Sequence, residues 1–429
     1  MGDDILGTEH LILGILIFIL TYITIVSEKI HRTVIAIFGA GLMILFHVLS
    51  QVEAFDKIDF NTLGLLIGMM IIVIVIRRTG LFQYLAIKSA KLAKGDPVKI
   101  LIYFSILTAI ASALLDNVTT ILLIVPVTLV ICDTLELNPI PFVISEIMSS
   151  NIGGAATLIG DPPNIMIGGE TGLNFDDFII NLLPLMIIVF IVTIIILRII
   201  YRKSLVTTEE RKQEMLSFDE NKAITDSKLL KKSLFILGLT ITGFVLSELI
   251  EVPSASIAMF GASALLLISK IEPEEIFEKI EWTTIFFFAG LFILVGSLES
   301  IGVIEFIAEK MLNITGGSIP ILTMIVLWMS AFLSSFLDNI PYVATMVPLI
   351  KTISEGALVS YEPVWWALSI GACLGGTGTI IGASANVVAR GIVEKNGYKM
   401  SFIGYIKIAY PIMILAIIIS TIYIIIFYL

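Results

Sequence analysis

The chain has 429 residues, of which 57% are hydrophobic and only 14% are charged, and its formal net charge is −10. Soluble domains carry about 25% charged residues, so this composition excludes an ordinary soluble enzyme and indicates a membrane protein that crosses the bilayer several times. The sequence has no strongly basic stripe, so nucleic acid is not expected as a partner.

Apolar segments in the first half predict five membrane spans and one hairpin. A helical span needs about 20 mostly apolar residues, and the expected spans lie near 9–27, 31–50, 60–78, 140–170 and 181–201. The segment 98–133 is also apolar, but Asp116 and Asn117 stand at its centre. We therefore expect a re-entrant hairpin whose polar tip lies at mid-membrane depth.

The second half predicts the same series of elements. Spans are expected near 231–249, 253–269, 281–298, 363–392 and 405–428, with a hairpin at 319–353. Five crossings per half is an odd number, so the second half enters the membrane upside down. The fold class is an all-α polytopic membrane protein, with a first inverted repeat at 1–201, a cytoplasmic linker at 202–230 and a second inverted repeat at 231–429.

Two polar motifs of the first half return in the second half at a constant spacing. LLDNVTT at 114–120 matches FLDNIPY at 336–342, and GGAATLIGDPPN at 153–164 matches GGTGTIIGASAN at 375–386. The step in numbering from Asp116 to Asp338 equals the step from Asn164 to Asn386, and we call this step the repeat offset. A two-fold repeat in a very apolar chain is typical of secondary transporters, whose binding site forms where the halves meet.

The distribution of Lys and Arg predicts which side each loop faces. With the N-terminus outside, 23 of the 26 Lys and Arg fall on the cytoplasmic side, and only Lys57, Lys310 and Lys351 remain outside. Basic residues concentrate on the cytoplasmic side of membrane proteins. We therefore expect both termini outside and the linker inside, in a prokaryotic plasma membrane.

Each half pairs a hairpin tip with a glycine-rich loop that interrupts a span. Such breaks leave carbonyl oxygens free to bind a cation, and hard cations such as Na⁺ prefer carboxylate, amide, hydroxyl and carbonyl oxygens. Na⁺ or H⁺ is therefore expected as the coupling ion, with no other cofactor. The candidate cation- and substrate-binding residues are Asp116, Asn117, Thr119, Thr120, Asn151, Gly153, Gly154, Thr157, Gly160, Asp161 and Asn164 in the first half, and Asp338, Asn339, Gly375, Gly376, Thr377, Thr379, Gly382, Ser384 and Asn386 in the second.

The tip acids also have a simpler interpretation as helix caps, because Asp and Asn are common N-cap residues. Two Asp-Asn pairs at one offset, each followed by an interrupted span, favour the binding interpretation. A carboxylate at mid-membrane is costly unless it is paired, and the spans show no obvious basic partner for Asp116 or Asp338. A bound cation or proton would compensate the charge.

Two other acids break the repeat. Asp161 is matched by Ala383, and Glu146 is matched by Leu368. Asp161 could belong to a simple Asp-Pro-Pro turn, but its position in the loop predicts an asymmetric site with a carboxylate in one half only. Glu146 is either a proton carrier or a buried acid near the cytoplasmic end of its span.

At these residues the chain resembles the ion transporter superfamily. LDNVTT followed by NIGGAATLIGDPPNIMI carries the resemblance, which covers nearly the whole chain. It is closest to the branch of the melanosomal P protein and of arsenite-permease-like and sodium/proton-antiporter-like proteins. Related divalent-anion/sodium symporters carry Ser-Asn-Thr at the hairpin tip, where this chain has Asp116-Asn117-Val118 and Asp338-Asn339-Ile340.

The resemblance implies a homodimer with a fixed scaffold domain and a transport domain that moves like an elevator, each domain drawn from both repeats. It also implies one sodium site between Asn117 and the 153–164 loop and another between Asn339 and the 375–386 loop. Substrate would lie between the two tips.

The two tip carboxylates disfavour a dianionic substrate and favour cations or protons. We therefore expect a Na⁺- or H⁺-coupled secondary transporter in the lipid bilayer, foremost a cation/proton antiporter, and not an enzyme. The alternatives are a coupled permease for an anion or small solute, arsenite-like or carboxylate, and more remotely a channel. A hairpin entering from each side builds alternating access, which argues against a channel.

Overall fold

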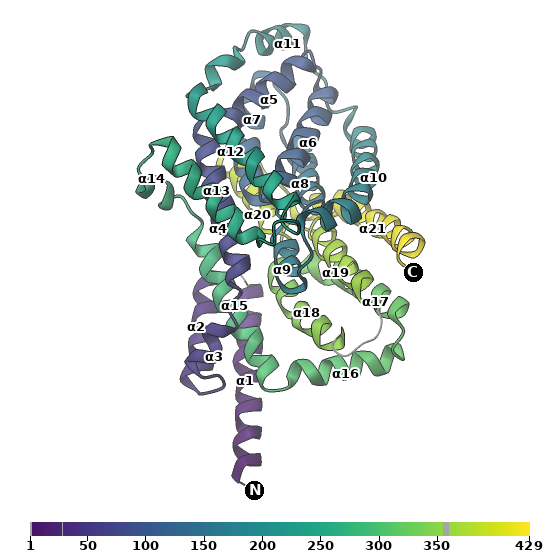
Figure 1. The fold of residues 1–429 in the computed structure, drawn as a ribbon. Helices are drawn as coiled ribbons and strands as arrows, with labels where there is room; N and C mark the ends of the chain where they lie inside the picture. The colour runs from purple at the N-terminus through teal and green to yellow at the C-terminus, as the bar shows by residue number, and fades with distance from the viewer. Residues whose placement is uncertain (1, 28, 355–359) are drawn as a thin grey trace.

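The computed structural model describes residues 2–27, 29–354 and 360–429. All regular elements in these residues are helical (Figure 1). Helices suit an apolar chain of this kind because they satisfy every backbone hydrogen bond within one segment, which lipid requires. The predicted all-α fold class is confirmed.

The first half of the described chain contains helices that run from the N-terminal region to the linker. They are α1 (Gly2–Ser27), α2 (Arg32–Leu45), α3 (Gln51–Asp56), α4 (Phe60–Arg78), α5 (Leu81–Leu92), α6 (Pro97–Leu114), α7 (Asn117–Thr134), α8 (Ile140–Gly154), α9 (Pro162–Thr171) and α10 (Phe175–Tyr201).

The linker contains a short helix and a 3₁₀ turn, and the second half follows with a matching series. The elements are α11 (Glu209–Leu216), η1 (Glu220–Ala223), α12 (Ser227–Val245), α13 (Ser254–Ser269), α14 (Pro273–Phe277), α15 (Trp282–Ser300), α16 (Val303–Thr315), α17 (Ile319–Phe336), α18 (Asn339–Ser354), α19 (Glu362–Gly375), α20 (Ser384–Lys395) and α21 (Phe402–Phe427).

Helices in the two halves begin at matching positions. The repeat offset separates Phe60, where α4 begins, from Trp282, where α15 begins, and it also separates the starts of α6 and α17, α7 and α18, and α9 and α20. The turn before α5 repeats before α16, because Gly80 and Gly302 have φ angles of 79° and 80°, a left-handed conformation that glycine adopts without strain. The repeat in the sequence is therefore a repeat of helices.

The two halves lie in opposite orientations. Helices α5, α6 and α7 lie toward the upper end of the molecule in Figure 1, and their counterparts α16, α17 and α18 lie toward the lower end. This is the inverted repeat that the sequence predicts, and it brings the tips of the two hairpins toward the middle of the molecule.

Helices of both halves mix in two bundles. The first bundle holds α1–α4 and α12–α15, in which α4 packs against α13 and α2 packs against α15. The second bundle holds α6–α10 and α17–α21, in which α6 packs against α8, α17 against α19, α7 against α20 and α18 against α9. Figure 1 shows the first bundle on the left and the second on the right.

The breaks in the second bundle fall at the polar motifs. α6 ends at Leu114 and α7 begins at Asn117, so residues 115–116 form the first hairpin tip. The expected spans at 140–170 and 363–392 are each two helices, α8 with α9 and α19 with α20, separated by irregular loops. α9 begins with Pro162, which lacks a backbone N–H and suits the first position of a new helix.

Eight helices of the described chain are long and apolar enough to cross a membrane: α1, α4, α6, α7, α10, α15, α17 and α21. α2 and α13 are apolar but shorter. Three of these eight, α6, α7 and α17, are hairpin arms, so helix length by itself does not fix how deep the hairpins enter.

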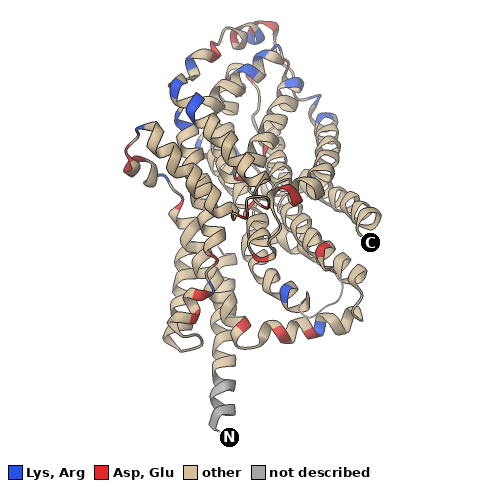
Figure 2. Cartoon of the chain, viewed as in Figure 1, with Lys and Arg blue, Asp and Glu red and all other residues tan. Residues whose placement is uncertain are grey.

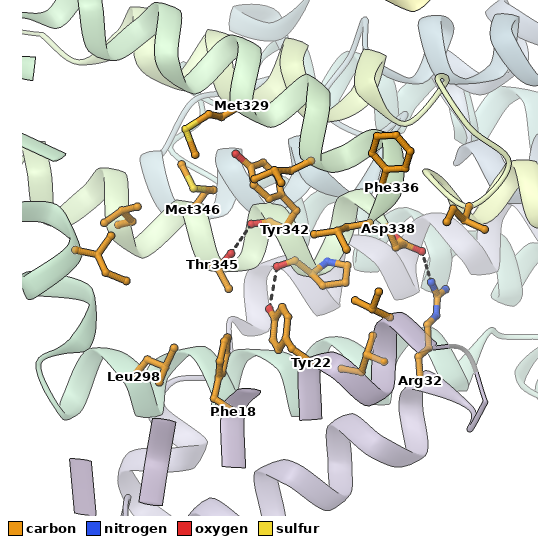
Figure 3. A pocket seen from close by; sticks show the side chains of 18 of the residues that line it. Phe18, Tyr22, Arg32, Leu298, Met329, Phe336, Asp338, Tyr342, Thr345 and Met346 are labelled. Atoms are coloured by element: carbon orange, nitrogen blue, oxygen red, sulfur yellow. Dashed lines mark hydrogen bonds and ion pairs between the residues drawn. The ribbon is translucent and has the colours of Figure 1, made fainter. Parts of the chain in front are cut away.

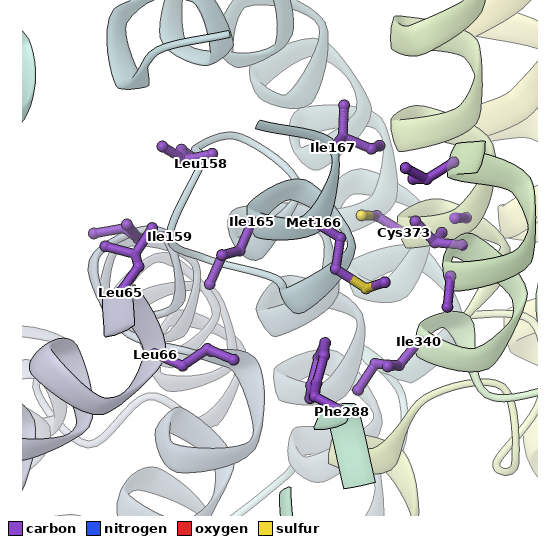
Figure 4. Close-up of a cluster of buried hydrophobic side chains, with 14 of the residues drawn as sticks. Leu65, Leu66, Leu158, Ile159, Ile165, Met166, Ile167, Phe288, Ile340 and Cys373 are labelled. Atoms are coloured by element: carbon purple, nitrogen blue, oxygen red, sulfur yellow. The ribbon is translucent and has the colours of Figure 1, made fainter. Parts of the chain in front are cut away.

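α9 is buried where the two bundles meet. Ile165, Met166 and Ile167 of α9 are at most 3% exposed, and Figure 4 shows them among side chains of both bundles, including Leu66 of α4 and Phe288 of α15. Such close packing fixes the position of the loop that precedes α9, and this loop carries Asp161.

Positive charge is uneven along the molecule. Lys and Arg gather at the upper end of Figure 2, over α5, α11 and the neighbouring loops, and are sparse in the lower half. The middle of the second bundle carries few charged residues, which fits a segment buried in lipid.

Candidate functional site

The two interrupting loops are closed by the asparagines that end their motifs. Asn164 Nδ2 donates to the carbonyls of Ala155 and Thr157, at 3.3 and 2.9 Å. Asn386 Nδ2 donates to the carbonyls of Gly376 and Thr379, both at 2.8 Å. Both amide N–H₂ groups are thus used in holding the loop shape.

The same asparagines tie the two repeats together. Asn386 Oδ1 accepts from Asn151 Nδ2 at 2.9 Å. Asn164 Oδ1 accepts from Ser369 Oγ at 2.6 Å and from Cys373 Sγ at 3.7 Å. Asn151 and Cys373 are counterparts at the repeat offset, so each loop is held by an equivalent position of the other repeat.

Hairpin and loop also pack closely within each repeat. Thr157 Oγ1 donates to the Ala113 carbonyl at 2.6 Å, and Thr379 Oγ1 donates to the Ser335 carbonyl. A Cβ on Gly153 would lie 2.2 Å from the Ala109 carbonyl oxygen. The small residues of the motifs therefore allow helix backbones to touch, in addition to any role as ligands.

Several other predicted residues take part in the same packing. A Cβ on Gly154 or Gly160 would lie 2.6 Å from the other's carbonyl oxygen, and Gly376 and Gly382 face each other similarly. A Cβ on Gly375 would lie 2.5 Å from the Ala331 carbonyl oxygen. Thr377 Oγ1 donates to the carbonyl of Leu374.

Asp161 is the centre of the site. Its side chain is completely buried. Asn117 Nδ2, from the tip of the first hairpin, donates to Asp161 Oδ1 at 3.3 Å, and Asn339 Nδ2, from the tip of the second hairpin, donates to both carboxylate oxygens at 3.2 and 3.3 Å. One carboxylate of the first half therefore joins the two tips, a contact that the asymmetry of the repeat did not specify.

A cavity of about 240 Å³ opens beside Asp161. Its wall contains the carboxylates of Asp116, Asp161 and Glu281 and the guanidinium of Arg32. The polar lining is completed by amide and hydroxyl residues, namely Asn117, Asn339, Thr283, Thr284 and Ser384. Apolar surface comes from Leu66, Met70 and Leu122. Carboxylates outnumber basic groups in this wall, so the cavity attracts positive charge.

Asp116 has both a structural role and a place in the cavity. Asp116 Oδ1 accepts from the Thr119 backbone N–H at 2.7 Å, which makes Asp116 the N-cap of α7. The capping interpretation is therefore correct for this residue, but the side chain also lines the cavity. No Lys or Arg of the described chain forms an ion pair with it.

Asp338 differs from Asp116, because it has a basic partner that the sequence did not reveal. Arg32 Nη1 forms an ion pair with Asp338 Oδ2 and donates to Ser384 Oγ at 2.7 Å, and Ser384 Oγ donates to Asp338 Oδ2 at 2.6 Å. The expectation of an unpaired Asp338 was wrong for this reason. Arg32 begins α2, in the other half of the sequence, and only the packing of the bundles brings it to the tip.

A second cavity, of about 890 Å³, lies on the other side of this ion pair. Figure 3 shows it between α1 and the second hairpin, with Phe18, Met329 and Phe336 among its mostly apolar lining. Arg32 and Ser384 line both cavities. The Arg32–Asp338–Ser384 group therefore separates a large apolar space from the small acidic one.

Thr120 and Glu146 are among the predicted residues that lie outside the acidic cavity. Thr120 is completely buried, and its hydroxyl has no hydrogen-bond partner within the described protein. Glu146 is also completely buried, on α8, where Thr128 Oγ1 donates to its Oε1 at 2.5 Å. Neither side chain lines the cavity.

Sequence reasoning missed Glu281 and Arg32. Glu281 precedes α15 in the place where Asp59 precedes α4, so the repeat offset provided a signal for this acid. Arg32 had no such signal, because its counterpart is Ser254. No group of three or more His, Cys, Asp or Glu suited to a metal ion occurs in the described residues.

Known proteins resemble the chain in sequence. A model of the citrate transporter family, CitMHS, matches residues 22–371. An uncharacterized transporter of Mycobacterium tuberculosis is 42% identical, over 91% of this chain and 92% of that protein. The P protein of Homo sapiens is 34% identical over 92% of this chain, which spans 57% of the P protein.

Two solved transporters resemble it in fold. The Alcanivorax borkumensis YdaH transporter has a TM-score of 0.60 and 14% identity, with 90% of this chain and 88% of that chain covered. Neisseria gonorrhoeae MtrF, described as one of a class of antimetabolite efflux pumps, has a TM-score of 0.62 and 14% identity, with 97% and 94% covered. At this identity the likeness concerns the fold alone.

Proposed function

Because the chain belongs to the citrate transporter family, and is therefore a secondary transporter integral to a membrane, we propose that it binds Na⁺ or H⁺ between the two hairpin tips and exchanges these ions as a cation/proton antiporter. The observation that carries the proposal is the buried carboxylate of Asp161. It accepts hydrogen bonds from the tip asparagines of both repeats, and no Lys or Arg of the described chain pairs with it.

The charge around the cavity supports a cationic ligand. Asp116, Asp161 and Glu281 face it, whereas the one guanidinium in the wall, of Arg32, is already paired with Asp338. A carboxylate at the centre of a membrane costs about 3 kcal/mol on insertion scales. A bound cation or proton removes this cost, so binding is favourable.

Asp161 also offers a way to couple the tips. The amide groups of Asn117 and Asn339 donate to the Asp161 carboxylate, but an amide can rotate and offer its oxygen instead. A cation on Asp161 would recruit both amide oxygens as ligands. Binding one ion would then change the contacts of both hairpins at once.

A displacement between the bundles supports an elevator-type movement. Gly169 on α9 faces the start of α4, because an added Cβ would lie 2.5 Å from Asp59 and 2.9 Å from Thr62. Its counterpart Gly391 on α20 has nothing within 4 Å. Thr284 is the counterpart of Thr62, and it lines the cavity together with Ser384. Ser384 lies two helical turns before Gly391 on α20.

This offset along α20 gives the size of the movement. Seven residues separate Ser384 from Gly391, and a helix rises about 1.5 Å per residue, so the two interfaces differ by about 10 Å and the second bundle is displaced by about 5 Å from a symmetric position. In an inverted repeat the opposite displacement forms the other state. There Gly391 would meet Thr284, and Gly169 would leave Thr62.

Paired cysteines test the movement. Thr62→Cys with Gly169→Cys should cross-link in the present state, and Thr284→Cys with Gly391→Cys should cross-link only in the other state. Na⁺ and pH should shift the yields of the two cross-links in opposite directions. Simultaneous formation of both, or a second cross-link that never forms during transport, would exclude a rigid displacement of this kind.

The remaining features of the proposal are the two re-entrant hairpins, the homodimer and the orientation. The gathering of Lys and Arg at one end of the molecule (Figure 2) supports a cytoplasmic linker. The proposed orientation has both termini outside. Labelling of single cysteines in the 202–230 linker from outside intact cells should fail, and successful labelling would reverse the orientation.

A coupled anion permease is the second candidate. The family model is described as a citrate transporter, and Arg32 stands in the wall of both cavities. A carboxylate substrate could pair with Arg32 in place of Asp338, because guanidinium binds carboxylates bidentately. In that case a citrate gradient would drive proton movement, and a Na⁺ gradient without a carboxylate would not.

Transport into proteoliposomes decides between these functions. A pH-sensitive dye inside the vesicles should report proton movement when a Na⁺ gradient is imposed, and Asp161→Asn should abolish it. Asp133→Asn is the matched control, since Asp133 is an exposed carboxylate whose partner is the Tyr398 hydroxyl. Wild-type transport by the Asp161→Asn variant would refute the cation site.

A further inference from the structure

A polar seam runs along α7 and α8 in the first repeat. It consists of Thr120 and Thr128 on α7 and of Glu146 and Ser149 on α8, and all four side chains are completely buried. None of the four lines the acidic cavity, so the ion site described above does not account for them.

The register of the two helices sets the direction of the α7–α8 seam. Thr128 meets Glu146 at one end, where its hydroxyl donates to Oε1 at 2.5 Å. Ser150 Oγ donates to the Asn117 carbonyl at 3.1 Å at the other end. Along the two helices, Thr120 and Ser149 fall between the residues of these two contacts. Because Asn117 also donates to Asp161, the seam leads from Glu146 to the ion site.

The seam contains unsatisfied polar atoms. Glu146 Oε2, Ser149 Oγ and Thr120 Oγ1 are buried and have no hydrogen-bond partner within the described protein. Each unsatisfied buried group costs about 1–3 kcal/mol, and buried polar groups are normally paired with protein or with ordered water. Three such atoms along one helix pair are consistent with a chain of water molecules.

The second repeat shows that the fold does not need this polarity. At the repeat offset, the counterparts of Thr120, Thr128, Glu146 and Ser149 are Tyr342, Ile350, Leu368 and Gly371. All four counterparts are buried on α18 and α19. The equivalent positions thus carry no acid, and their one hydroxyl, of Tyr342, pairs with Ser330. The polar seam therefore serves something other than packing.

Other titratable groups near α8 do not neutralise Glu146. The buried ones on the helices that pack against α8 are Cys132 of α7, Tyr201 of α10, Cys373 of α19 and Tyr405 of α21. The acidic and basic side chains of these helices are exposed or half-buried. No Lys or Arg of the described chain forms an ion pair with Glu146, so a proton is the simplest means of neutralising it.

We propose that Glu146 is a proton-binding site and that the α7–α8 seam passes protons between Glu146 and Asp161. The Glu146 carboxylic acid releases its proton from Oε2 to a neighbouring water or hydroxyl, each member of the chain donates its own proton onward, and the Asp161 carboxylate accepts the last one when its cation leaves. The reverse sequence reloads Glu146. The inference rests on the proposed function, and it adds where the proton is held.

Glu146→Gln tests the proton site, because Gln keeps the size of the side chain and an acceptor for Thr128 but cannot take up a proton. Proton movement driven by a Na⁺ gradient should fall about 100-fold or more, as losses of positioned proton carriers do. Isotopic Na⁺/Na⁺ exchange at equal pH should continue. Coupled proton movement at the wild-type rate, or equal loss of both activities in a folded variant, would overturn the proposal.

A spectroscopic readout separates this inference from the proposed function. The infrared band of a buried carboxylic acid should vanish as pH is raised in the wild type and should be missing from Glu146→Gln. Identical spectra for the two proteins at every pH would refute the proton site whatever ion is transported. In contrast, Asp161→Asn should abolish Na⁺/Na⁺ exchange, and its failure to do so would refute the cation site alone.

The path itself is tested by removing hydroxyls. Thr120→Val and Ser149→Ala should slow proton movement and leave Na⁺/Na⁺ exchange intact. Thr108→Val is the matched control, because Thr108 is also completely buried in the first repeat but donates to the Phe104 carbonyl of its own helix. Equal proton movement in the wild type and both path variants would exclude the seam as the route.

Discussion

The two hairpin tips carry the same Asp-Asn pair, yet they have different electrostatic surroundings. Asp338 is held by Arg32 and Ser384, whereas Asp116 caps α7 and faces the acidic cavity with Asp161 and Glu281. The difference comes from the first bundle, where the counterpart of Arg32 is Ser254. A repeated motif therefore defines where a site forms, and its non-repeated neighbours define what charge the site accepts.

The largest expected effect concerns the two acids. Asp116→Asn should weaken cation binding about 10- to 100-fold, which is the usual cost of removing a group that supports a bound metal ion. The protein should stay folded, because Asn also caps helices. Asp338→Asn should weaken it less, because Arg32 already neutralises that carboxylate. Isothermal titration with Na⁺ measures both. A larger loss in Asp338→Asn would contradict the comparison.

The two repeats should respond alike where they serve packing. Gly153→Ala would place a Cβ 2.2 Å from a backbone carbonyl oxygen, and Gly375→Ala would place one at 2.5 Å. Such overpacking lowers the free energy of unfolding by about 1–3 kcal/mol. Gly391→Ala is the control, with nothing within 4 Å, and alanine should favour its helix by about 1 kcal/mol. Thermal unfolding in detergent should rank the three variants, and a stable Gly153→Ala protein would show that the loop can shift.

A double-mutant cycle measures the strength of the Arg32–Asp338 ion pair at the second hairpin tip. Arg32→Met and Asp338→Asn should each alter stability, and together they should show a coupling energy of about 1 kcal/mol, since contacting groups interact by about 0.5–3 kcal/mol and this pair is partly exposed. Additive effects would show that the ion pair contributes nothing. Ser384→Ala, which keeps both charges, serves as the reference.

The smallest expected effect lies in the linker, which has no counterpart in either repeat. Lys91 donates to Glu220 at 2.6 Å and holds the pKa of the Glu220 carboxyl below its ordinary value. The pair therefore stabilises the docking of the linker on α5 above the normal pKa of Glu, and this contribution is lost as pH falls through the lowered pKa. Hydrogen exchange of residues 218–224 should rise at acid pH, and Glu220→Gln should remove that dependence.

Much of the fold was readable from the sequence. The constant repeat offset predicted the repeat of helices, and the Gly-rich loops predicted the breaks between α8 and α9 and between α19 and α20. Asp161 was expected to make the site asymmetric, and it does join the two tips. These features depend on local composition and on spacing, which the chain carries directly.

Other features depended on contacts between distant segments. The ion pair of Arg32 with Asp338 spans 306 residues, and no pattern in the sequence relates the two. Glu281 lines the cavity, whereas its counterpart Asp59 faces Gly169, and the repeat offset alone does not predict this difference. The polar seam between α7 and α8 became visible only when the register showed which buried hydroxyls adjoin Glu146.

The sequence by itself determined an apolar, duplicated chain with polar breaks at fixed positions, because lipid demands helices and penalises unpaired polar groups. Only the tertiary structure decided which acid remains without a basic partner, since that depends on the side chains that the packed bundles bring within a few ångströms. Charge interactions of this kind fall off with distance and with solvent exposure. They are therefore a property of the assembled site and not of the motif.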